Sequence, residues 1–167
     1  MTDIKEIFKS QQAKREELKK STYKQRLAKI KSIEKFISDQ ANIDRLEKAL
    51  YADFKKPGTE VLLTELGVIH AQITYIRSNL SFWMMNKRVD TPLLLTGTSS
   101  HIKYEPKGTC LVLAPWNYPF NLAIVPTLYA MAAGNTVMLK PSELTPNTSA
   151  YIAEMIGQLF DSSEFAV

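Results

Sequence analysis

Residues 109–119 read TCLVLAPWNYP, an apolar run of strand length that ends in a cluster of polar and aromatic residues. The same arrangement returns at residues 136–143, TVMLKPSE, where a second apolar run ends in a lysine, a proline, a serine and a glutamate. Between the two runs lies an almost wholly apolar segment, residues 119–133, which is long enough for a helix. Strand, helix and strand in this order, followed by a further helix, indicate a parallel sheet built by right-handed crossovers.

The region before residue 90 is predicted to be helical. Apolar residues recur at spacings of three and four over residues 23–37, 46–54 and 62–80, and each series forms one stripe on a helix. Ser21 is expected to cap the first of these helices, and Pro57 to separate the second from the third. The third stripe is a narrow seam that favours packing along another helix, so a coiled-coil module is an alternative interpretation.

Beyond residue 90 the pattern changes to short strands. Residues 93–95 and 99–105 are predicted to form the strands of a hairpin. After the second buried strand, Thr145 is expected to cap a helix that begins at Pro146, and residues 164–167 are expected to start a further strand. The fold class is therefore α/β: an N-terminal helical region leads into a parallel sheet that is still incomplete at residue 167.

The composition is that of a globular protein. Of the 167 residues, 45% are hydrophobic and 23% are charged, which are ordinary values for a globular domain. No apolar run approaches the roughly 18–20 residues of a membrane helix, and the N-terminus lacks the apolar core of a signal peptide. A single cysteine, Cys110, excludes an internal disulfide and fits a reducing compartment. We therefore expect a cytoplasmic protein with no membrane segment in this stretch.

The net charge of +4 comes from the N-terminal third of the chain. Residues 1–60 hold 15 Lys and Arg against 10 Asp and Glu, whereas residues 61–167 hold 6 against 7. The lysines at positions 20, 24, 31 and 35 lie at helical spacing opposite an apolar stripe, and no aromatic residues interleave with the basic ones. These lysines are interpreted as a solvated helix face, and no nucleic-acid partner is expected.

The two polar clusters are expected to meet at one edge of the sheet. In an open parallel sheet, ligands bind outside the carboxyl ends of the strands. Trp116 and Asn117 follow one strand end, and Lys140 to Glu143 follow the neighbouring one. The glycine-rich fingerprint Gly-x-Gly-x-x-Gly is absent, so a pyrophosphate group would not be held by the first turn in the common way.

Three linked motifs carry a family resemblance. Residues 114–120 read APWNYPF, residues 132–137 read AAGNTV and residues 139–143 read LKPSE. In their order and spacing, they make the whole chain resemble the N-terminal part of an aldehyde dehydrogenase of the shorter, class-3-like kind. The resemblance implies N-terminal helices that pack on the cofactor domain (1–90), a hairpin of the oligomerisation region (91–107), and the first half of a Rossmann-like NAD(P)-binding domain (108–167), with the catalytic domain absent from this stretch.

The resemblance implies a role for each motif residue. Asn117 matches the family's catalytic asparagine, whose amide donates a hydrogen bond to the aldehyde oxygen as a cysteine thiolate attacks. Trp116 would lie beside the adenosine half of the cofactor, and Lys140 and Glu143 would hold its ribose. The implied cofactor-binding residues are Leu113, Ala114, Pro115, Trp116, Asn117, Lys140, Ser142 and Glu143.

The cofactor implied in this way is NAD, with NADP possible. A carboxylate accepts both hydroxyl groups of a ribose and repels a 2′-phosphate, so Glu143 favours NAD. The ammonium group of Lys140 would instead attract that phosphate. Without the neighbouring motif, Lys140 and Glu143 would be interpreted as an exposed ion pair.

Other reactive residues are interpreted as structural. Cys110 falls inside a predicted strand, whereas His70 and His101 lie away from the predicted edge. No metal-ligand cluster accompanies the two histidines, so no metal is expected. The resemblance places the nucleophilic cysteine and the general-base glutamate beyond residue 167. The stretch is therefore expected to be a fragment without dehydrogenase activity of its own.

As an intact protein, the chain is expected to oxidise a small-molecule aldehyde to a carboxylic acid through a cysteine thiohemiacetal, and to form a homodimer. Two alternatives remain open, namely a helical dimerisation or interaction module and a non-catalytic nucleotide-binding fragment. Saturable binding of NAD would separate the nucleotide-binding alternatives from the helical module.

Overall fold

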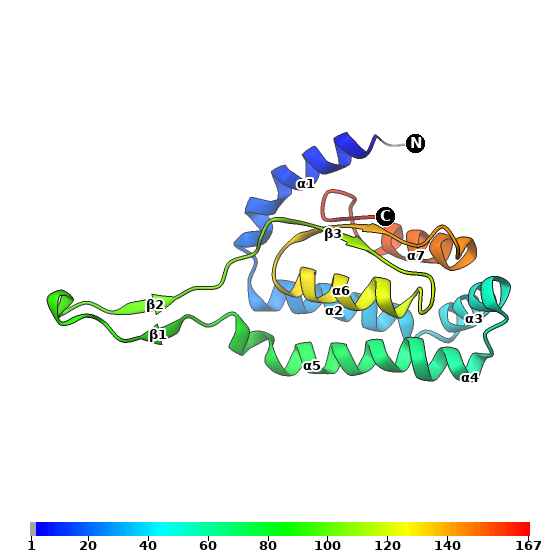
Figure 1. The fold of residues 1–167 in the computed structure, drawn as a ribbon, viewed down its shortest axis with the longest axis horizontal. Helices are drawn as coiled ribbons and strands as arrows, with labels where there is room; N and C mark the ends of the chain where they lie inside the picture. The colour runs from blue at the N-terminus through cyan, green and yellow to red at the C-terminus, as the bar shows by residue number, and fades with distance from the viewer. Residues whose placement is uncertain (1–2) are drawn as a thin grey trace.

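Helices form the first half of the chain in the computed structural model, which describes residues 3–167 (Figure 1). The three apolar stripes of the sequence coincide with buried helix faces, on which Ile30, Leu50 and Ile73 are fully buried. The elements are, in chain order, α1 (Ile4–Lys19), α2 (Tyr23–Ile37), α3 (Gln40–Phe54), the short α4 (Gly58–Glu60), a π-helical turn (Val61–Leu66) and α5 (Gly67–Trp83).

The start of α2 differs from the prediction by one residue. Thr22, not Ser21, is the N-cap: its hydroxyl accepts from the Gln25 backbone N–H at 3.3 Å, and the Gln25 side chain accepts from the Thr22 backbone N–H at 2.8 Å. This reciprocal capping box needs a glutamine or glutamate three residues after the cap, and Thr22 has one where Ser21 does not. The Ser21 hydroxyl donates instead to the Leu18 carbonyl.

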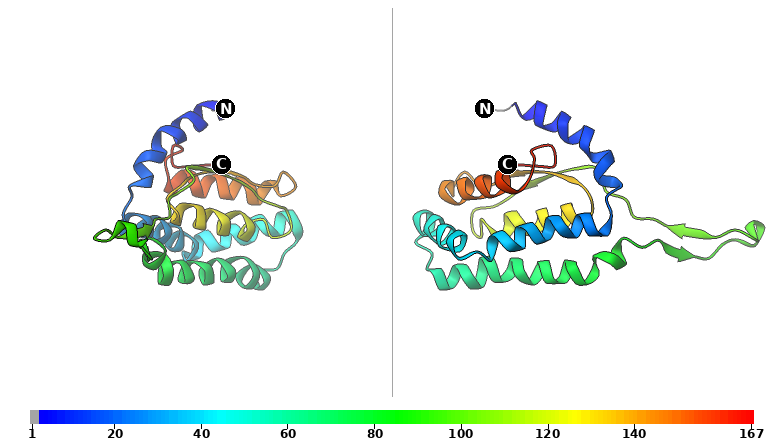
Figure 2. Two further views of the ribbon diagram at one scale, coloured as in Figure 1. Left: turned by 60° about the vertical axis from the view of Figure 1, so that its left-hand side comes forward. Right: turned by 180° about the vertical axis from the view of Figure 1, so that it is seen from behind.

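The hairpin is present, but its strands are not those predicted. Strands β1 (Lys87–Val89) and β2 (Ser100–Ile102) pair antiparallel, with Lys87 opposite Ile102. Leu93–Leu95, predicted as a strand, is a 3₁₀ turn near the tip. Because the hairpin projects away from the rest of the molecule (Figures 1 and 2), its strands bury no face and carry no apolar alternation that would identify them.

The predicted parallel sheet is confirmed. Strands β3 (Thr109–Leu113), β4 (Thr136–Lys140) and β5 (Phe165–Ala166) pair parallel in the order β3-β4-β5. Helices α6 (Asn121–Ala132) and α7 (Pro146–Leu159) provide the two crossovers.

Helix α6 has no polar face because protein surrounds it. It lies between the sheet and the helices α2 and α5, while α1 lies on the opposite face of the sheet (Figure 1). Phe120, Ile124 and Leu128 are consequently fully buried. Helix α7 packs against α3, which brings the C-terminal end of α3 close to the start of α7.

The lysines predicted to form a solvated helix face, Lys20, Lys24, Lys31 and Lys35, are all exposed. Among the helices of residues 3–167, none is both long enough and apolar enough to cross a membrane.

Candidate functional site

The two polar clusters leave the sheet side by side. Leu113 and Lys140 are partners at the ends of the parallel strands β3 and β4, and the Ala114 backbone N–H donates to the Lys140 carbonyl at 3.0 Å. The segments that follow, residues 114–120 and 141–145, therefore begin at the same edge of the sheet. We call these two segments the carboxyl-edge loops. This placement agrees with the prediction from sequence that both clusters share one edge.

Lys140 and Glu143 form an ion pair on the second carboxyl-edge loop. The Lys140 ammonium lies 2.5 Å from a Glu143 carboxylate oxygen. The hydrogen bond from Lys140 holds the pKa of the Glu143 carboxyl below its usual value. The two side chains are 59% and 76% exposed, so the pair contributes little to stability and is accessible to a ligand.

Ser142 lies between them but faces the protein. It is buried, and its hydroxyl accepts from the Leu144 backbone N–H at 3.2 Å. Its carbonyl accepts hydrogen bonds from the hydroxyls of Thr145 and Ser149. Ser142 therefore shapes the turn, and one lone pair of its hydroxyl is used there.

Asn117 sits on the exposed part of the first carboxyl-edge loop. Its side chain is exposed and, within residues 3–167, forms no hydrogen bond to another residue, so both amide hydrogens are available to a ligand. The neighbouring Trp116 is 53% exposed, and its ring centroid lies 6.4 Å from that of Phe54. Of the other predicted contact residues, Leu113 and Pro115 are exposed and Ala114 is half-buried.

The α7 start is capped from outside the helix, which the sequence did not reveal. Thr145 precedes the helix as predicted, but its side chain does not cap it and donates to the Ser142 carbonyl. Asp53, at the end of α3, accepts instead from the backbone N–H groups of Asn147 at 3.1 Å and Thr148 at 2.8 Å. Burial alone would raise the pKa of Asp53, but the hydrogen bonds from Asn147 and Thr148 outweigh it and lower the pKa.

Three other side chains lie near the first loop, and the sequence did not predict that they would. Lys56 and Glu65 form a buried ion pair, and Glu65 also accepts from the Asn121 backbone N–H. Phe54 packs on Trp116. The contacts to Asn121 and Trp116 join residues that are more than fifty positions apart, so no local pattern could have indicated them.

The remaining reactive residues, one cysteine and two histidines, lie outside the carboxyl-edge loops. Cys110 lies within β3 opposite Val137, and burial raises the pKa of its thiol, which makes it a poor nucleophile. His70 lies on α5 and His101 on β2. Within residues 3–167, no three His, Cys, Asp or Glu side chains group closely enough to hold a metal ion.

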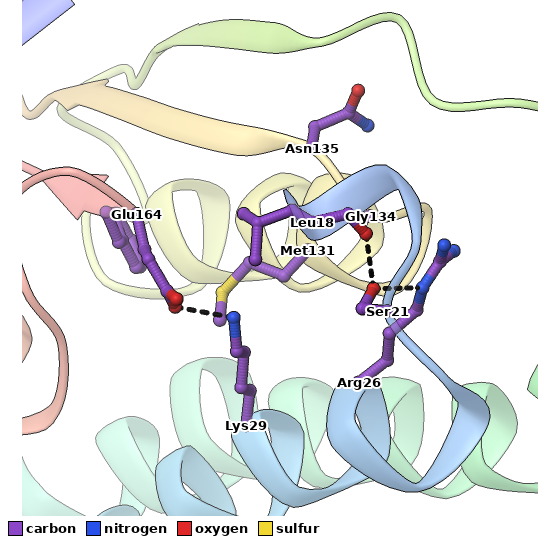
Figure 3. Close-up of a pocket in the computed structure, with 9 residues that line it drawn as sticks. Leu18, Ser21, Arg26, Lys29, Met131, Gly134, Asn135 and Glu164 are labelled. Atoms are coloured by element: carbon purple, nitrogen blue, oxygen red, sulfur yellow. Dashed lines mark hydrogen bonds and ion pairs between the residues drawn. The ribbon is translucent and has the colours of Figure 1, made fainter. Parts of the chain in front are cut away.

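A small pocket lies at the opposite edge of the sheet. It holds about 10 Å³, room for about one water molecule, and is bordered by Ser21, Arg26 and Gly134 (Figure 3). The Lys29–Glu164 ion pair forms another part of its wall. Because Gly134 precedes β4, this cavity is separate from the carboxyl-edge loops.

Comparison with known sequences identifies relatives along most of the chain. Residues 1–160 match the aldehyde dehydrogenase family. The chain is 43% identical over 165 residues to the 4,4'-diaponeurosporen-aldehyde dehydrogenase of Staphylococcus aureus, which covers 99% of this chain and 34% of that protein. It is 42% identical over 142 residues to aldehyde dehydrogenase family 3 member B2 of Mus musculus, with 85% and 29% covered. The chain thus spans about a third of the length of these relatives.

Solved structures share the fold, which confirms the predicted fold class. A substrate-bound Staphylococcus aureus AldH matches with a TM-score of 0.92 and 38% identity, covering 100% of this chain and 36% of that one. A succinic semialdehyde dehydrogenase from Streptococcus pyogenes, in complex with NADP+, matches with a TM-score of 0.81 over 99% of this chain and 36% of that one. Its identity is 16%, so this second likeness concerns the fold alone.

Proposed function

Because this chain belongs to the aldehyde dehydrogenase family, we propose that the intact protein oxidises an aldehyde to a carboxylic acid with NAD or NADP. In the proposed reaction a cysteine thiolate attacks the aldehyde to form a thiohemiacetal. Loss of a hydride from the former aldehyde carbon, with the oxidised dinucleotide as acceptor, would give a thioester, and water would hydrolyse that thioester to the acid. One observation carries the proposal: Asn117 and the Lys140–Glu143 pair lie on loops that begin at the same edge of one parallel sheet.

The chemistry of the carboxyl-edge loops fits the adenosine end of a dinucleotide. Ribose hydroxyls are donors, and Glu143 offers an exposed carboxylate acceptor. The exposed indole of Trp116 offers an apolar surface for the adenosine, and Leu113, Ala114 and Pro115 would line the same site through their backbone. When bound, the nicotinamide ring would supply the hydride acceptor. The Ser142 hydroxyl keeps its own O–H donor while it accepts from Leu144, but the side chain is buried, so its contact with the cofactor is the weakest of those proposed.

The proposed role of Asn117 is electrostatic. Its side-chain amide would donate a hydrogen bond to the aldehyde oxygen as that oxygen becomes negatively charged. The amide has no competing partner within residues 3–167, and the side chain is exposed at the edge where the substrate would enter. A neutral donor suits this task because it stabilises the developing charge without itself exchanging a proton.

The Lys140–Glu143 pair bears on the choice between NAD and NADP. Glu143 favours a ribose with both hydroxyls free, while the ammonium of Lys140 would offset part of the repulsion from a 2′-phosphate. We propose NAD as the preferred cofactor, with NADP accepted.

Residues 1–167 alone are proposed to lack dehydrogenase activity. Their single cysteine, Cys110, lies within β3 and has a raised thiol pKa, so the nucleophile must come from another part of the intact protein. Residues 1–167 should bind NAD saturably but produce no NADH with an aldehyde. Aldehyde-dependent NADH production by this segment would contradict the proposal.

The intact protein is further proposed to be a homodimer in which the 91–107 region bridges the subunits. Residues 1–90 are proposed to pack on the cofactor domain, and residues 108–167 to form the first half of that domain. The hairpin projects from the molecule, and Leu93 and Leu94 near its tip are 92% and 98% exposed. Exposed leucines of this kind favour a protein contact. Sedimentation of the intact protein tests this assembly, and a monomer would contradict it.

The Asn117→Ala substitution tests the proposed chemistry. In the intact protein it should lower kcat by about 10²–10³ because one oxyanion donor is lost. The affinity for NAD, measured by titration, should change little. An unchanged kcat in a folded variant would contradict the assigned role.

A further inference from the structure

A buried ion pair lies behind the loop that carries Asn117. Glu65 is fully buried, and its Oε1 accepts a hydrogen bond at 2.8 Å from Nζ of Lys56, whose side chain is only 5% exposed. Removing two charges from water is costly, and apolar residues of similar volume are often as stable in such a place. Stability alone therefore does not explain this pair.

The second oxygen of Glu65 holds the start of α6. Its Oε2 accepts from the Asn121 backbone N–H at 2.7 Å, and the Asn121 side-chain amide donates to the Thr64 carbonyl at 3.0 Å. Phe120, the residue at the N-cap position, provides no side-chain cap. Glu65 thus acts as the cap from a distant part of the chain, and a carboxylate is the favoured charge at a helix N-terminus.

The partner of Glu65 contacts the residue next to Asn117. The Lys56 Nζ lies 4.5 Å from the centroid of the Tyr118 ring, within the range of a cation–π interaction. The loop is therefore held at Tyr118 by Lys56 and at Asn121 by Glu65. Asn117 directly precedes this held stretch.

The local helix geometry supports a special role for Glu65. It belongs to the π-helical turn Val61–Leu66, where Val61, Glu65 and Leu66 are the buried residues. π-Helical turns are rare and occur frequently at functional sites.

We propose that Glu65 and Lys56 are positioning residues for Asn117, fixing the loop so that the Asn117 amide meets the oxygen of the reacting aldehyde. This inference rests on the proposed function, because it takes the oxyanion role of Asn117 as given. Neither residue touches the reacting atoms; both act through Tyr118 and Asn121. A displacement of about 1 Å in a catalytic group can cost up to about 10²-fold in rate, which sets the scale of the expected effect.

The test uses Glu65→Gln in the intact protein. Glutamine keeps the size but offers one oxygen to two donors, so one of the two contacts is lost. We expect kcat to fall by about 10- to 10²-fold with KM for the aldehyde little changed. Hydrogen exchange should increase in the peptide covering residues 114–122 and stay unchanged in α7. The matched control is Glu60→Gln, because Glu60 is a 47% exposed carboxylate 3.8 Å from the same lysine but does not contact Asn121.

The double variant Glu65→Gln/Asn117→Ala separates positioning from a general loss of stability. If Glu65 acts only through Asn117, the double variant should be no slower than Asn117→Ala alone. Multiplicative losses, or a folded Glu65→Gln variant with unchanged kcat and exchange, would overturn the inference. An Asn117→Ala variant with full activity would instead refute the proposed function, so the two failures are distinguishable.

If Glu65→Gln does not fold, two substitutions of Tyr118 test the positioning role of Lys56 instead. Tyr118→Leu removes the aromatic face beneath Lys56, whereas Tyr118→Phe keeps it, and the 38% exposure of Tyr118 makes both changes tolerable. We expect Tyr118→Leu to lower kcat about fivefold and Tyr118→Phe to leave it unchanged. Equal kcat values for the two variants would overturn the role of Lys56.

Discussion

At the scale of single residues, the important property of Glu143 is that its carboxylate is both charged and exposed to solvent. Its carboxyl has a lowered pKa, primarily because Lys140 donates a hydrogen bond to it, so the carboxylate is ionised at neutral pH. An ionised acceptor at the end of β4 suits two ribose hydroxyls and opposes a phosphate. The cofactor preference of the protein should therefore depend on this one charge.

The substitution Glu143→Gln tests that dependence. We expect the affinity for NAD to fall about tenfold, as for the loss of a charged hydrogen-bond acceptor, while the affinity for NADP stays equal or rises. Isothermal titration with each dinucleotide measures the ratio. Glu154→Gln is the matched control, since Glu154 is also an exposed carboxylate paired with a basic residue, Arg45, but lies on α7. Equal losses for both dinucleotides would argue against a ribose contact at Glu143.

At the scale of elements, Asp53 joins α3 to α7. The side chain accepts hydrogen bonds from the backbone and side chains of Asn147 and Thr148, at distances from 2.7 to 3.1 Å. Asp53→Asn should lower the free energy of unfolding by about 1–2 kcal/mol, as expected for a lost helix cap. Urea denaturation at pH 7 measures this, with the exposed Asp90→Asn as the control.

The effect of Asp53 should depend on pH in a defined direction. Its pKa is lowered in the folded protein, so the ionised carboxylate stabilises the fold at any pH above the ordinary value of 3.8. That contribution disappears as the pH falls through the folded pKa. The difference between wild type and Asp53→Asn should therefore be constant from about pH 7 to pH 5 and shrink below about pH 4. A difference that grows on acidification would contradict the hydrogen-bonding account.

Two glycines provide a paired test of the α6 and α7 helices. Gly134, which ends α6, has φ +90°, and an added Cβ would lie 2.6 Å from the Arg26 guanidinium. Gly134→Ala should lower the free energy of unfolding by about 1–3 kcal/mol. Gly157 in α7 faces open space, so Gly157→Ala should raise it by about 0.5–1 kcal/mol. Thermal denaturation of both variants measures the two changes in the free energy of unfolding, which should have opposite signs. Equal changes in the two variants would refute the packing argument.

The sequence predicted the buried elements better than the exposed ones. Strands β3 and β4 and the helix α6 follow from continuous apolar runs, because burial on several sides leaves no room for polar residues. The hairpin strands at Lys87–Val89 and Ser100–Ile102 have no buried face, so the apolar Leu93–Leu95 was mistaken for a strand. The two apparent helix caps, Ser21 and Thr145, were wrong because neighbouring or distant side chains provide better acceptors.

At the scale of the whole molecule, the order of the strands brings the two parts of the proposed site together. Parallel pairing of Leu113 with Lys140 brings two motifs to one edge although they lie more than twenty residues apart in the chain, and the strand-helix-strand pattern is sufficient to predict this. The supporting contacts of Asp53, Lys56 and Glu65 depend on how the N-terminal helices dock on the sheet. Periodicity shows which face of a helix is buried but not against which partner, so these residues could not be identified from sequence.

A crystal structure of the intact protein with bound NAD+ tests the central claim most directly, namely that the carboxyl-edge loops form the dinucleotide site. We predict that the adenosine ribose lies within hydrogen-bonding distance of Glu143, with the adenosine beside Trp116. A dinucleotide bound at the opposite edge of the sheet, near Arg26 and Gly134, would contradict the account.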